Sequence, residues 1–312
     1  RNNTDNEYRI ILWDLNLNGL SREKFREKLL SLKEKPDIIG IGGIVTIFNH
    51  LLWMSKICKE IFPEAILIAG GSVASTVPHL LFEHSPIDIC VEGEGERSLL
   101  EIIKSVERGA EVDELKDIPG LILRGCGSVD TVRTSLRASI PDLDTFGMPA
   151  YDLIDVKKYA VNGILSLRSY GRDIPPEIYA DGSFHMYIMS SRGCTGRCSF
   201  CYRQFPKVEL HSIGFIKSHI LFLHNKYGIN VVTFADELFN VSDRRLNEMI
   251  RCLSEVKNNI PNFYFRICGA RTDVINYEIM KKLRDLGCFQ IIYGLESGSQ
   301  KMLNLMHKRT SV

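Results

Sequence analysis

The sequence predicts an α/β protein in which a doubly wound domain is followed by part of a (β/α) barrel. Short apolar runs alternate with segments of helical spacing along the first 110 residues, and a second series of the same kind starts at His185. Short buried strands that alternate with helices are typical of a parallel sheet with helices on both faces. A chain of 312 residues is also long enough for about two domains.

The first series predicts a sheet whose strands end in glycine. The predicted strands cover residues 8–15, 37–43, 65–71 and 87–93, with helices over 21–35, 50–62 and 96–108. Parallel sheets bind ligands beyond the carboxyl ends of their strands, and glycine lets a large ligand approach the backbone closely. Glycine can also simply end a strand, but four such sites at one predicted edge favour a binding surface. These sites are Asp14–Gly19, Gly42-Gly43, Gly70-Gly71-Ser72 and Gly93-Glu94-Gly95-Glu96.

The rest of the chain predicts a connector and a second β/α series. Residues from about 111 to 185 are less regular, with a strand at 120–123 and a loop over 169–184. In the second series the predicted strands cover 186–190, 231–235, 263–268 and 289–293, and the predicted helices cover 212–226, 242–256 and 276–286. This alternation fits a barrel that is cut short. We therefore divide the chain into a front domain at 1–135, a connector at 136–184 and a partial barrel at 185–312.

The composition excludes a partner that is attracted by charge alone. The 39 lysines and arginines nearly balance the 38 aspartates and glutamates, so the net charge is +1 and no long-range field attracts nucleic acid or an anionic membrane. No apolar run approaches the roughly 18 residues that a membrane-spanning helix needs. The polar start at 1–6 lacks the apolar region of a signal peptide, and 302–308 resembles a helix in progress. We expect a piece of a longer cytoplasmic protein.

Three of the nine cysteines form the strongest chemical signal. Cys194, Cys198 and Cys201 lie within eight residues, directly after a predicted strand. Closely spaced thiolates on one loop ligate iron–sulfur clusters, and three ligands leave one iron of a four-iron cluster open. A zinc site completed by His185 or His211 is the alternative, but the C-x3-C-x2-C spacing does not match the two separated pairs of a zinc ribbon. The other cysteines are scattered through apolar stretches, as expected of reduced thiols, at positions 58, 90, 126, 252, 268 and 288.

This cysteine motif, with the aromatic Phe200 before its last cysteine, resembles the radical S-adenosylmethionine superfamily. The segments Phe234–Glu237, Arg271–Asp273 and Gly294–Ser299 follow the next three predicted strands, where that superfamily places its cofactor contacts. The resemblance implies that the three cysteines hold a [4Fe–4S] cluster and that S-adenosylmethionine chelates the open iron. The implied S-adenosylmethionine contacts are Phe200, Asp236, Glu237, Arg271, Glu296 and Ser297.

The resemblance also implies the chemistry. An electron from the reduced cluster breaks a carbon–sulfur bond of S-adenosylmethionine and a 5′-deoxyadenosyl radical forms, while the protein orients the cofactors and excludes water and oxygen. Two of the carboxylates have an alternative role, because Asp236 and Glu237 could cap the next helix. Arg271 could equally form a surface ion pair with Asp273 or Glu278.

The front domain resembles the cobalamin-binding domain that precedes many radical enzymes of this superfamily. The resemblance is carried by 36–43, 62–71 and 88–96, and by 118–121 and 142–151 in the linking segment. Relatives that supply a histidine to cobalt carry D-x-H-x-x-G and S-x-L, but here Asn16 and Gly42 stand in the histidine and serine positions. A carboxamide is a poor cobalt ligand, so we expect no histidine ligand. The implied cobalamin contacts are Asn16, Gly42, Gly43, Thr46, Gly70, Gly71, Ser72, Gly93, Glu94 and Gly95.

Three functions remain open. The first is methyl transfer from cobalamin to an unactivated carbon or phosphorus, and the second is oxidative cyclisation or rearrangement with the same cofactors. The third is a non-catalytic iron–sulfur or zinc module of a sensor or electron carrier. The front domain could also have kept its fold and lost cobalamin, with 16–19 forming a plain turn. We expect an external electron donor such as flavodoxin or ferredoxin, no nucleic-acid partner, and a small-molecule or peptide substrate that the sequence does not identify.

Overall fold

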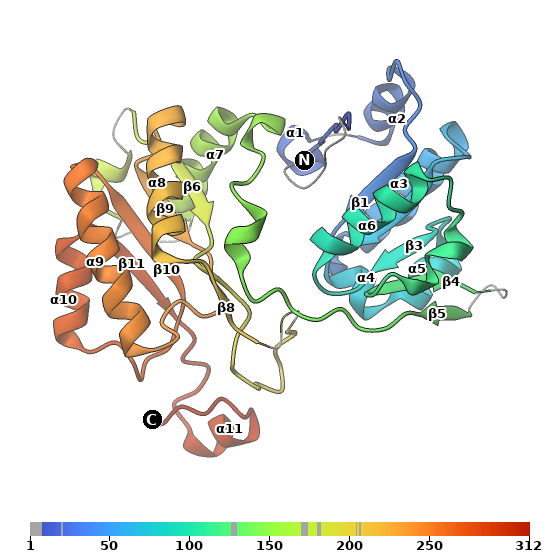
Figure 1. Ribbon diagram of the computed structural model, residues 1–312. Helices are drawn as coiled ribbons and strands as arrows, with labels where there is room; N and C mark the ends of the chain where they lie inside the picture. The colour runs from blue at the N-terminus through green and yellow to red at the C-terminus, as the bar shows by residue number, and fades with distance from the viewer. Residues whose placement is uncertain are drawn as a thin grey trace. The chain divides into compact units, whose positions relative to one another are not determined.

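The computed structural model describes residues 8–19, 21–125, 130–169, 174–179, 182–203, 205 and 207–312. The chain has an α/β fold, and its described residues divide into a front unit, residues 14–139, and a second unit, residues 8–13 and 140–312 (Figure 1). Each unit is built around a sheet of its own. In the described part of the chain no helix is both long and apolar enough to cross a membrane.

The front unit contains a five-stranded sheet with the strand order β1-β2-β3-β4-β5. Its strands are β1 (Ile38–Gly42), β2 (Ile66–Gly70), β3 (Ile89–Val91), β4 (Leu121–Arg124) and β5 (Thr131–Arg133). Three of the strands predicted within the parallel series, β1 to β3, are parallel to one another, whereas β4 and β5, which follow that series, are antiparallel to their neighbours. The segment before β4 returns to the carboxyl end of β3, where the Glu92 amide donates to the Gly120 carbonyl at 2.9 Å. A strand that starts at this end must run antiparallel to β3.

The helices of the front unit alternate with its strands. They are α2 (Arg22–Leu30), α3 (Phe48–Ile61), α4 (Ser72–Thr76), α5 (Pro78–His84) and α6 (Gly95–Glu107), with a 3-10 segment η1 (Val45–Ile47) before α3 and another, η2 (Val112–Asp117), before β4. Strand β2 lies inside the sheet, between β1 and β3, and contributes Leu67 and Ala69, both fully buried, to the core. Leu51 of α3, Leu81 of α5 and Ile102 of α6 are also fully buried, as their helical spacing predicts.

The strand predicted over 8–15 does not form. Residues 8–14 are part of neither sheet, and α1 (Leu15–Asn18) follows them. Oδ1 of Asp14 accepts a hydrogen bond from the Leu17 amide at 2.7 Å, so this side chain caps a helical turn. Strands β1 and β2 pair directly along their whole length, which leaves no place for another strand between them. Ile10, Ile11 and Leu12, which join neither sheet, are about half exposed.

The second unit contains a parallel four-stranded sheet with the order β11-β10-β9-β6. Its strands are β6 (His185–Ile188), β9 (Val231–Phe234), β10 (Tyr264–Ala270) and β11 (Cys288–Tyr293), and its helices include α8 (Ile213–Tyr227), α9 (Asp243–Asn259), α10 (Tyr277–Asp285) and α11 (Gln300–Leu305). Each of the first three helices starts at a side-chain cap, from Ser212, Ser242 and Asn276 respectively. The predicted alternation of this series is confirmed, but the helix expected over 302–308 ends at Leu305.

Helix α7 (Val156–Ser169) was not predicted by the sequence pattern, which indicated irregular structure and then a loop. Its β-branched residues, asparagine and glycine lower helix propensity, so the helix depends on packing. Gly163 lies directly against β6, because a Cβ atom there would be 2.4 Å from His185 Nδ1. The remaining short elements of this unit are η3 (Leu143–Phe146), η4 (Tyr151–Leu153), η5 (Pro176–Tyr179) and the hairpin strands β7 (Ser191–Arg192) and β8 (Glu209–Leu210).

A buried histidine in this core predicts a loss of stability in acid. The Tyr151 hydroxyl lies 2.8 Å from His219 Nε2, and both residues are buried. Burial, with a smaller contribution from His211, lowers the pKa of His219 from 6.5 to about 4. Between these values only the unfolded chain binds the proton, so His219 alone should lower the free energy of unfolding by about 3 kcal/mol as the pH drops from 7 to 4, in addition to any loss from other buried groups.

Thermal unfolding of the wild type and of His219→Gln at pH 7 and pH 5 measures this effect. The glutamine cannot titrate, so the variant should lose less stability than the wild type over this interval, whatever its stability at pH 7. Equal losses in the two proteins would contradict the assignment to His219.

Candidate functional site

The three clustered cysteines lie on the loop between β7 and β8, which we call the cysteine loop (residues 193–208). Cys194 and Cys198 are partly buried and Cys201 is exposed. The loop crosses itself closely at Gly193, which has a φ of +87°, and a Cβ atom there would lie 1.9 Å from the Lys207 carbonyl oxygen. Only glycine fits this position. The Arg203 guanidinium donates to the Gly196 carbonyl at 2.9 Å and ties the middle of the loop.

The thiols of this loop fit the donor set of an iron–sulfur cluster. All three are free, and the amide of Gly196 donates to Cys194 Sγ at 3.3 Å. A Cβ atom on Gly196 would lie 3.3 Å from Cys194 Sγ and 3.8 Å from Cys198 Sγ, so these two sulfurs face the same region. Burial, followed by the charges of Cys198 and Cys194, raises the pKa of Cys201. Thiolates that lie close together repel one another, and a bound metal cluster would offset this repulsion.

Within the described residues no group of three or more His, Cys, Asp or Glu side chains is arranged to hold a metal ion. The two histidines considered for a zinc site are each engaged elsewhere. His185 is buried, with Nε2 2.8 Å from Thr233 Oγ1. His211 Nδ1 lies 2.8 Å from Asp144 Oδ1, and its ring stacks on Phe215 at 4.3 Å. These contacts weigh against a Cys₃His site, and the role of the cysteines stays a prediction.

Asp236, at the end of β9, lies behind the cysteine loop and is 3% exposed. Its Oδ1 accepts from the Ser190 amide and the Ser191 hydroxyl, both at 2.8 Å, and from the Ser191 amide, while Oδ2 accepts from the Ser190 hydroxyl at 3.2 Å. Burial raises the pKa of Asp236, and the serine hydrogen bonds oppose this shift. The carboxylate therefore holds the backbone that leads from β6 into the cysteine loop.

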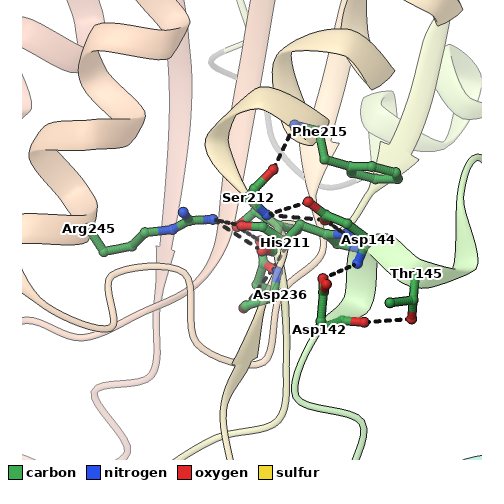
Figure 2. Close-up of polar contacts among 10 residues, drawn as sticks. Asp142, Asp144, Thr145, His211, Ser212, Phe215, Asp236 and Arg245 are labelled. Atoms are coloured by element: carbon green, nitrogen blue, oxygen red, sulfur yellow. Dashed lines mark hydrogen bonds and ion pairs between the residues drawn. The ribbon is translucent and has the colours of Figure 1, made fainter.

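Three more polar residues, Arg245, His211 and Asp144, extend this arrangement (Figure 2). Buried Arg245 of α9 donates from Nη2 to the His211 carbonyl at 2.7 Å and to the Ser190 carbonyl at 3.4 Å. His211 and the Ser212 amide both contact Asp144, at 2.8 and 3.1 Å. We call Asp144, His211, Asp236 and Arg245 the anchor cluster. It joins both ends of the cysteine loop to the connector. The sequence analysis named Asp236 and His211 for other roles and the linking segment 142–151, but it missed Arg245.

Two of the predicted S-adenosylmethionine contacts meet through a residue that the sequence analysis missed. Lys308 donates to Glu296 Oε1 at 3.1 Å, and its ammonium lies 6.0 Å from the centre of the Phe200 ring. The Ser199 amide donates to the Met306 carbonyl at 3.0 Å, which holds the two segments together. Glu296 has a φ of +60°, an uncommon conformation that is often found at functional sites. Ser297 follows it, with its amide donating to the Leu295 carbonyl.

Glu237 and Arg271 also lie near the cysteine loop. The charge of Glu237 contributes to the raised pKa of Cys201. Arg271 pairs with Asp273, and this hydrogen bond raises the pKa of Arg271. The charges of Cys194 and Cys198 make smaller contributions in the same direction. The surface pair considered from the sequence is therefore formed. The backbone of Arg271 is held on both sides by the buried Asn240 side chain at 2.9 Å, a second contact that the sequence analysis missed.

In the front unit, most of the predicted cobalamin contacts share one edge of the sheet. Gly71 has a φ of +81°, and a Cβ atom there would lie 2.5 Å from the Gly43 carbonyl oxygen, so packing alone requires this glycine. A Cβ atom on Gly42, Gly70 or Gly93 would meet nothing within 4 Å, which leaves room for a ligand at these strand ends. The remaining predicted cobalamin contacts are Ser72 at the start of α4, Thr46 in η1, and Glu94 and Gly95 at the start of α6. Asn16 is part of α1, and its side chain lies outside the described part of the structure.

Residues 188–312 match the Radical SAM superfamily model. An uncharacterized methyltransferase of Pyrococcus horikoshii is 26% identical, over 94% of this chain and 59% of the relative. An anaerobic magnesium-protoporphyrin IX monomethyl ester cyclase of Cereibacter sphaeroides is 26% identical, over 94% of this chain and 45% of the relative. A cytidylyl-2-hydroxyethylphosphonate methyltransferase of Streptomyces wedmorensis is 23% identical, over 88% and 52%. The chain thus spans about half the length of these curated relatives.

Two solved structures share the fold. The cobalamin-dependent S-adenosylmethionine radical enzyme OxsB, with aqua-cobalamin and S-adenosylmethionine bound, gives a TM-score of 0.71 at 18% identity and covers 96% of this chain and 40% of its own. The radical S-adenosylmethionine methyltransferase TsrM of Kitasatospora setae, with cobalamin and a [4Fe–4S] cluster bound, gives 0.68 at 17% identity over 96% and 56%. The predicted resemblance to radical S-adenosylmethionine proteins with a cobalamin domain is confirmed.

Proposed function

Residues 188–312 belong to the Radical SAM superfamily, and on this premise we propose that the protein holds a [4Fe–4S] cluster on Cys194, Cys198 and Cys201 and cleaves S-adenosylmethionine reductively. The observation that carries the proposal is the cysteine loop, where three free thiols stand on a backbone tied by Gly193 and Arg203. When bound, the cluster and S-adenosylmethionine supply the one-electron cleavage that yields a 5′-deoxyadenosyl radical.

The residues around the loop divide into two roles. Phe200, Glu237, Arg271, Glu296, Ser297 and Lys308 would contact S-adenosylmethionine, because they lie on the loop or on the segments beside it. Asp236 was predicted as a contact as well, but its oxygens are engaged with Ser190 and Ser191. We assign Asp236 to holding the loop in place. A fixed loop lets the thiols keep their positions while one coordination site stays open.

The front unit would bind cobalamin at the glycine-lined edge of its sheet, without a histidine ligand to cobalt, since Asn16 stands in that position. We retain the division into a doubly wound cobalamin-binding domain at 1–135, a connector at 136–184 and a partial barrel at 185–312. The methyltransferase relatives and the cobalamin-bound structural neighbours support methyl transfer to an unactivated centre. We place the enzyme in the cytoplasm, with flavodoxin or ferredoxin as electron donor.

Cyclisation or rearrangement is the second candidate, because anaerobic cyclases match 94% to 97% of this chain at identities similar to those of the methyltransferases. The products separate the two. Methyl transfer yields S-adenosylhomocysteine alongside 5′-deoxyadenosine, whereas cyclisation yields only 5′-deoxyadenosine.

Anaerobic reconstitution of the full-length protein with iron, sulfide and cobalamin tests the proposal. Reduction in the presence of S-adenosylmethionine should release 5′-deoxyadenosine, measured by liquid chromatography. A reconstituted protein that releases none would overturn the enzyme assignment and favour a non-catalytic iron–sulfur or zinc module.

A further inference from the structure

Two segments beside the proposed cluster are strongly basic, although the whole chain is nearly neutral. Residues 192–207 and 297–312 contain seven lysines and arginines and no aspartate or glutamate, whereas the chain has 39 cationic and 38 acidic residues. The cations are Arg192, Arg197, Arg203, Lys207, Lys301, Lys308 and Arg309. Such a local excess of one sign creates a potential at this surface that the net charge of the chain does not reveal.

The two basic segments lie against each other. The Ser199 amide donates to the Met306 carbonyl at 3.0 Å, and Lys308 lies 6.0 Å from the Phe200 ring centre. The cations of 297–312 therefore lie on a segment that contacts the cysteine loop, whose own cations belong to 192–207 and whose Cys201 is exposed.

The seven cations divide by their surroundings. Three of the cations contact partners within the protein. Arg192 lies over the Phe205 ring at 5.2 Å, Arg203 donates to the Gly196 carbonyl, and Lys308 pairs with Glu296. The other four are exposed and form no ion pair with any residue in the described ranges. These four residues, which we call the basic face, are Arg197, Lys207, Lys301 and Arg309.

We propose that the basic face docks an acidic protein that carries one electron at low potential. The inference rests on the proposed function, because a cluster that cleaves S-adenosylmethionine must be reduced from outside. A carrier docked on the basic face reaches the protein beside the exposed Cys201. In the transfer the carrier is oxidised by one electron and the cluster is reduced by one, and no atom moves. Charge complementarity of this kind raises the rate of encounter and orients the two proteins.

A nucleic acid fits the basic face less well. Proteins that bind duplexes through phosphates commonly make about 6–10 such contacts, and four exposed cations in a chain of net charge +1 provide fewer. The acids nearest in sequence, Glu209 and Glu296, would also repel a dense row of phosphates. A folded acidic protein presents a few spaced carboxylates instead, which four spaced cations can match.

Charge reversal at two exposed positions tests the proposal. The double variant Lys207→Glu/Lys301→Glu is compared with the wild type in the reconstituted full-length protein, with reduced flavodoxin or reduced methyl viologen as the electron source. We expect kcat/KM for flavodoxin to fall about tenfold or more, and the wild-type value to fall with added salt. Cleavage of S-adenosylmethionine with methyl viologen, which needs no docking, should stay at the wild-type rate.

The matched control is Arg251→Glu/Lys281→Glu, which makes the same charge change at exposed positions on α9 and α10 and should leave both rates unchanged. An unaltered rate with flavodoxin in the Lys207/Lys301 variant would overturn the proposal. An equal loss of cleavage rate with flavodoxin and with methyl viologen would also overturn it, because the substitutions would then have damaged the loop itself. Loss of transfer-RNA binding with an unaltered flavodoxin rate would assign the face to nucleic acid. No cleavage by the wild type with either reductant would instead refute the proposed function.

Discussion

Replacing Cys198 with alanine should abolish both the iron–sulfur chromophore of the reconstituted protein and the release of 5′-deoxyadenosine. The cluster would keep only two of three thiolate ligands, and Cys198 lies between the other two on a loop whose backbone is fixed by Gly193 and Arg203. The measurements are iron and sulfide content, the electron paramagnetic resonance signal of the reduced protein, and product formation. Cobalamin binding should be retained, because Cys198 lies in the second unit.

The matched control for this substitution is Cys58→Ala in α3. Cys58 is fully buried, and burial raises the pKa of its thiol to about 12, so this sulfur stays protonated and ligates nothing. The control should keep its cluster and its cleavage activity, with a modest loss of stability from the small cavity. A Cys198→Ala protein that still cleaved S-adenosylmethionine would show that the ligand assignment is wrong.

The substitution Asp236→Ala should both destabilise the second unit and loosen the cysteine loop. It removes the acceptor of four hydrogen bonds from Ser190 and Ser191, and it takes away a negative charge near buried Arg245. Each buried donor left without a partner costs about 1–3 kcal/mol, so the free energy of unfolding should fall by more than about 3 kcal/mol. Urea unfolding of the protein before reconstitution measures this loss.

If Asp236 positions the cysteine loop, its replacement should have a second effect that a loss of stability alone would not produce. At a temperature where the Asp236→Ala protein remains folded, the addition of S-adenosylmethionine should change the electron paramagnetic resonance signal of its reduced cluster less than in the wild type. The control is Asp243→Ala, an exposed carboxylate in the first turn of α9, which should cost less than about 1 kcal/mol. A wild-type spectral response in Asp236→Ala would refute the positioning role.

The β/α series of the second unit could be predicted because its signals are local. Each central strand is a short apolar run, and each following helix begins at a serine or asparagine cap. The front unit was harder for a physical reason. Residues 8–15 are apolar enough for a strand, but 8–14 join neither sheet and Asp14 caps a helical turn instead. Strand direction depends on where a connection re-enters the sheet, which no short window of sequence records.

The sequence by itself determined the α/β class and the motif of Cys194, Cys198 and Cys201, because apolar periodicity and thiol spacing are local properties. It also carried the resemblance to the radical S-adenosylmethionine superfamily, through the motifs that follow successive strands, and residues 188–312 match the model of that superfamily. Only the tertiary structure decided what surrounds those cysteines. Asp144, His211, Asp236 and Arg245 are separated by up to about a hundred positions, and they meet because the parallel strands and their helices bring these segments behind one loop. The structure likewise brought the two basic segments together, since the hydrogen bond from Ser199 to Met306 and the contact of Lys308 with the Phe200 ring join residues that no sequence pattern connects.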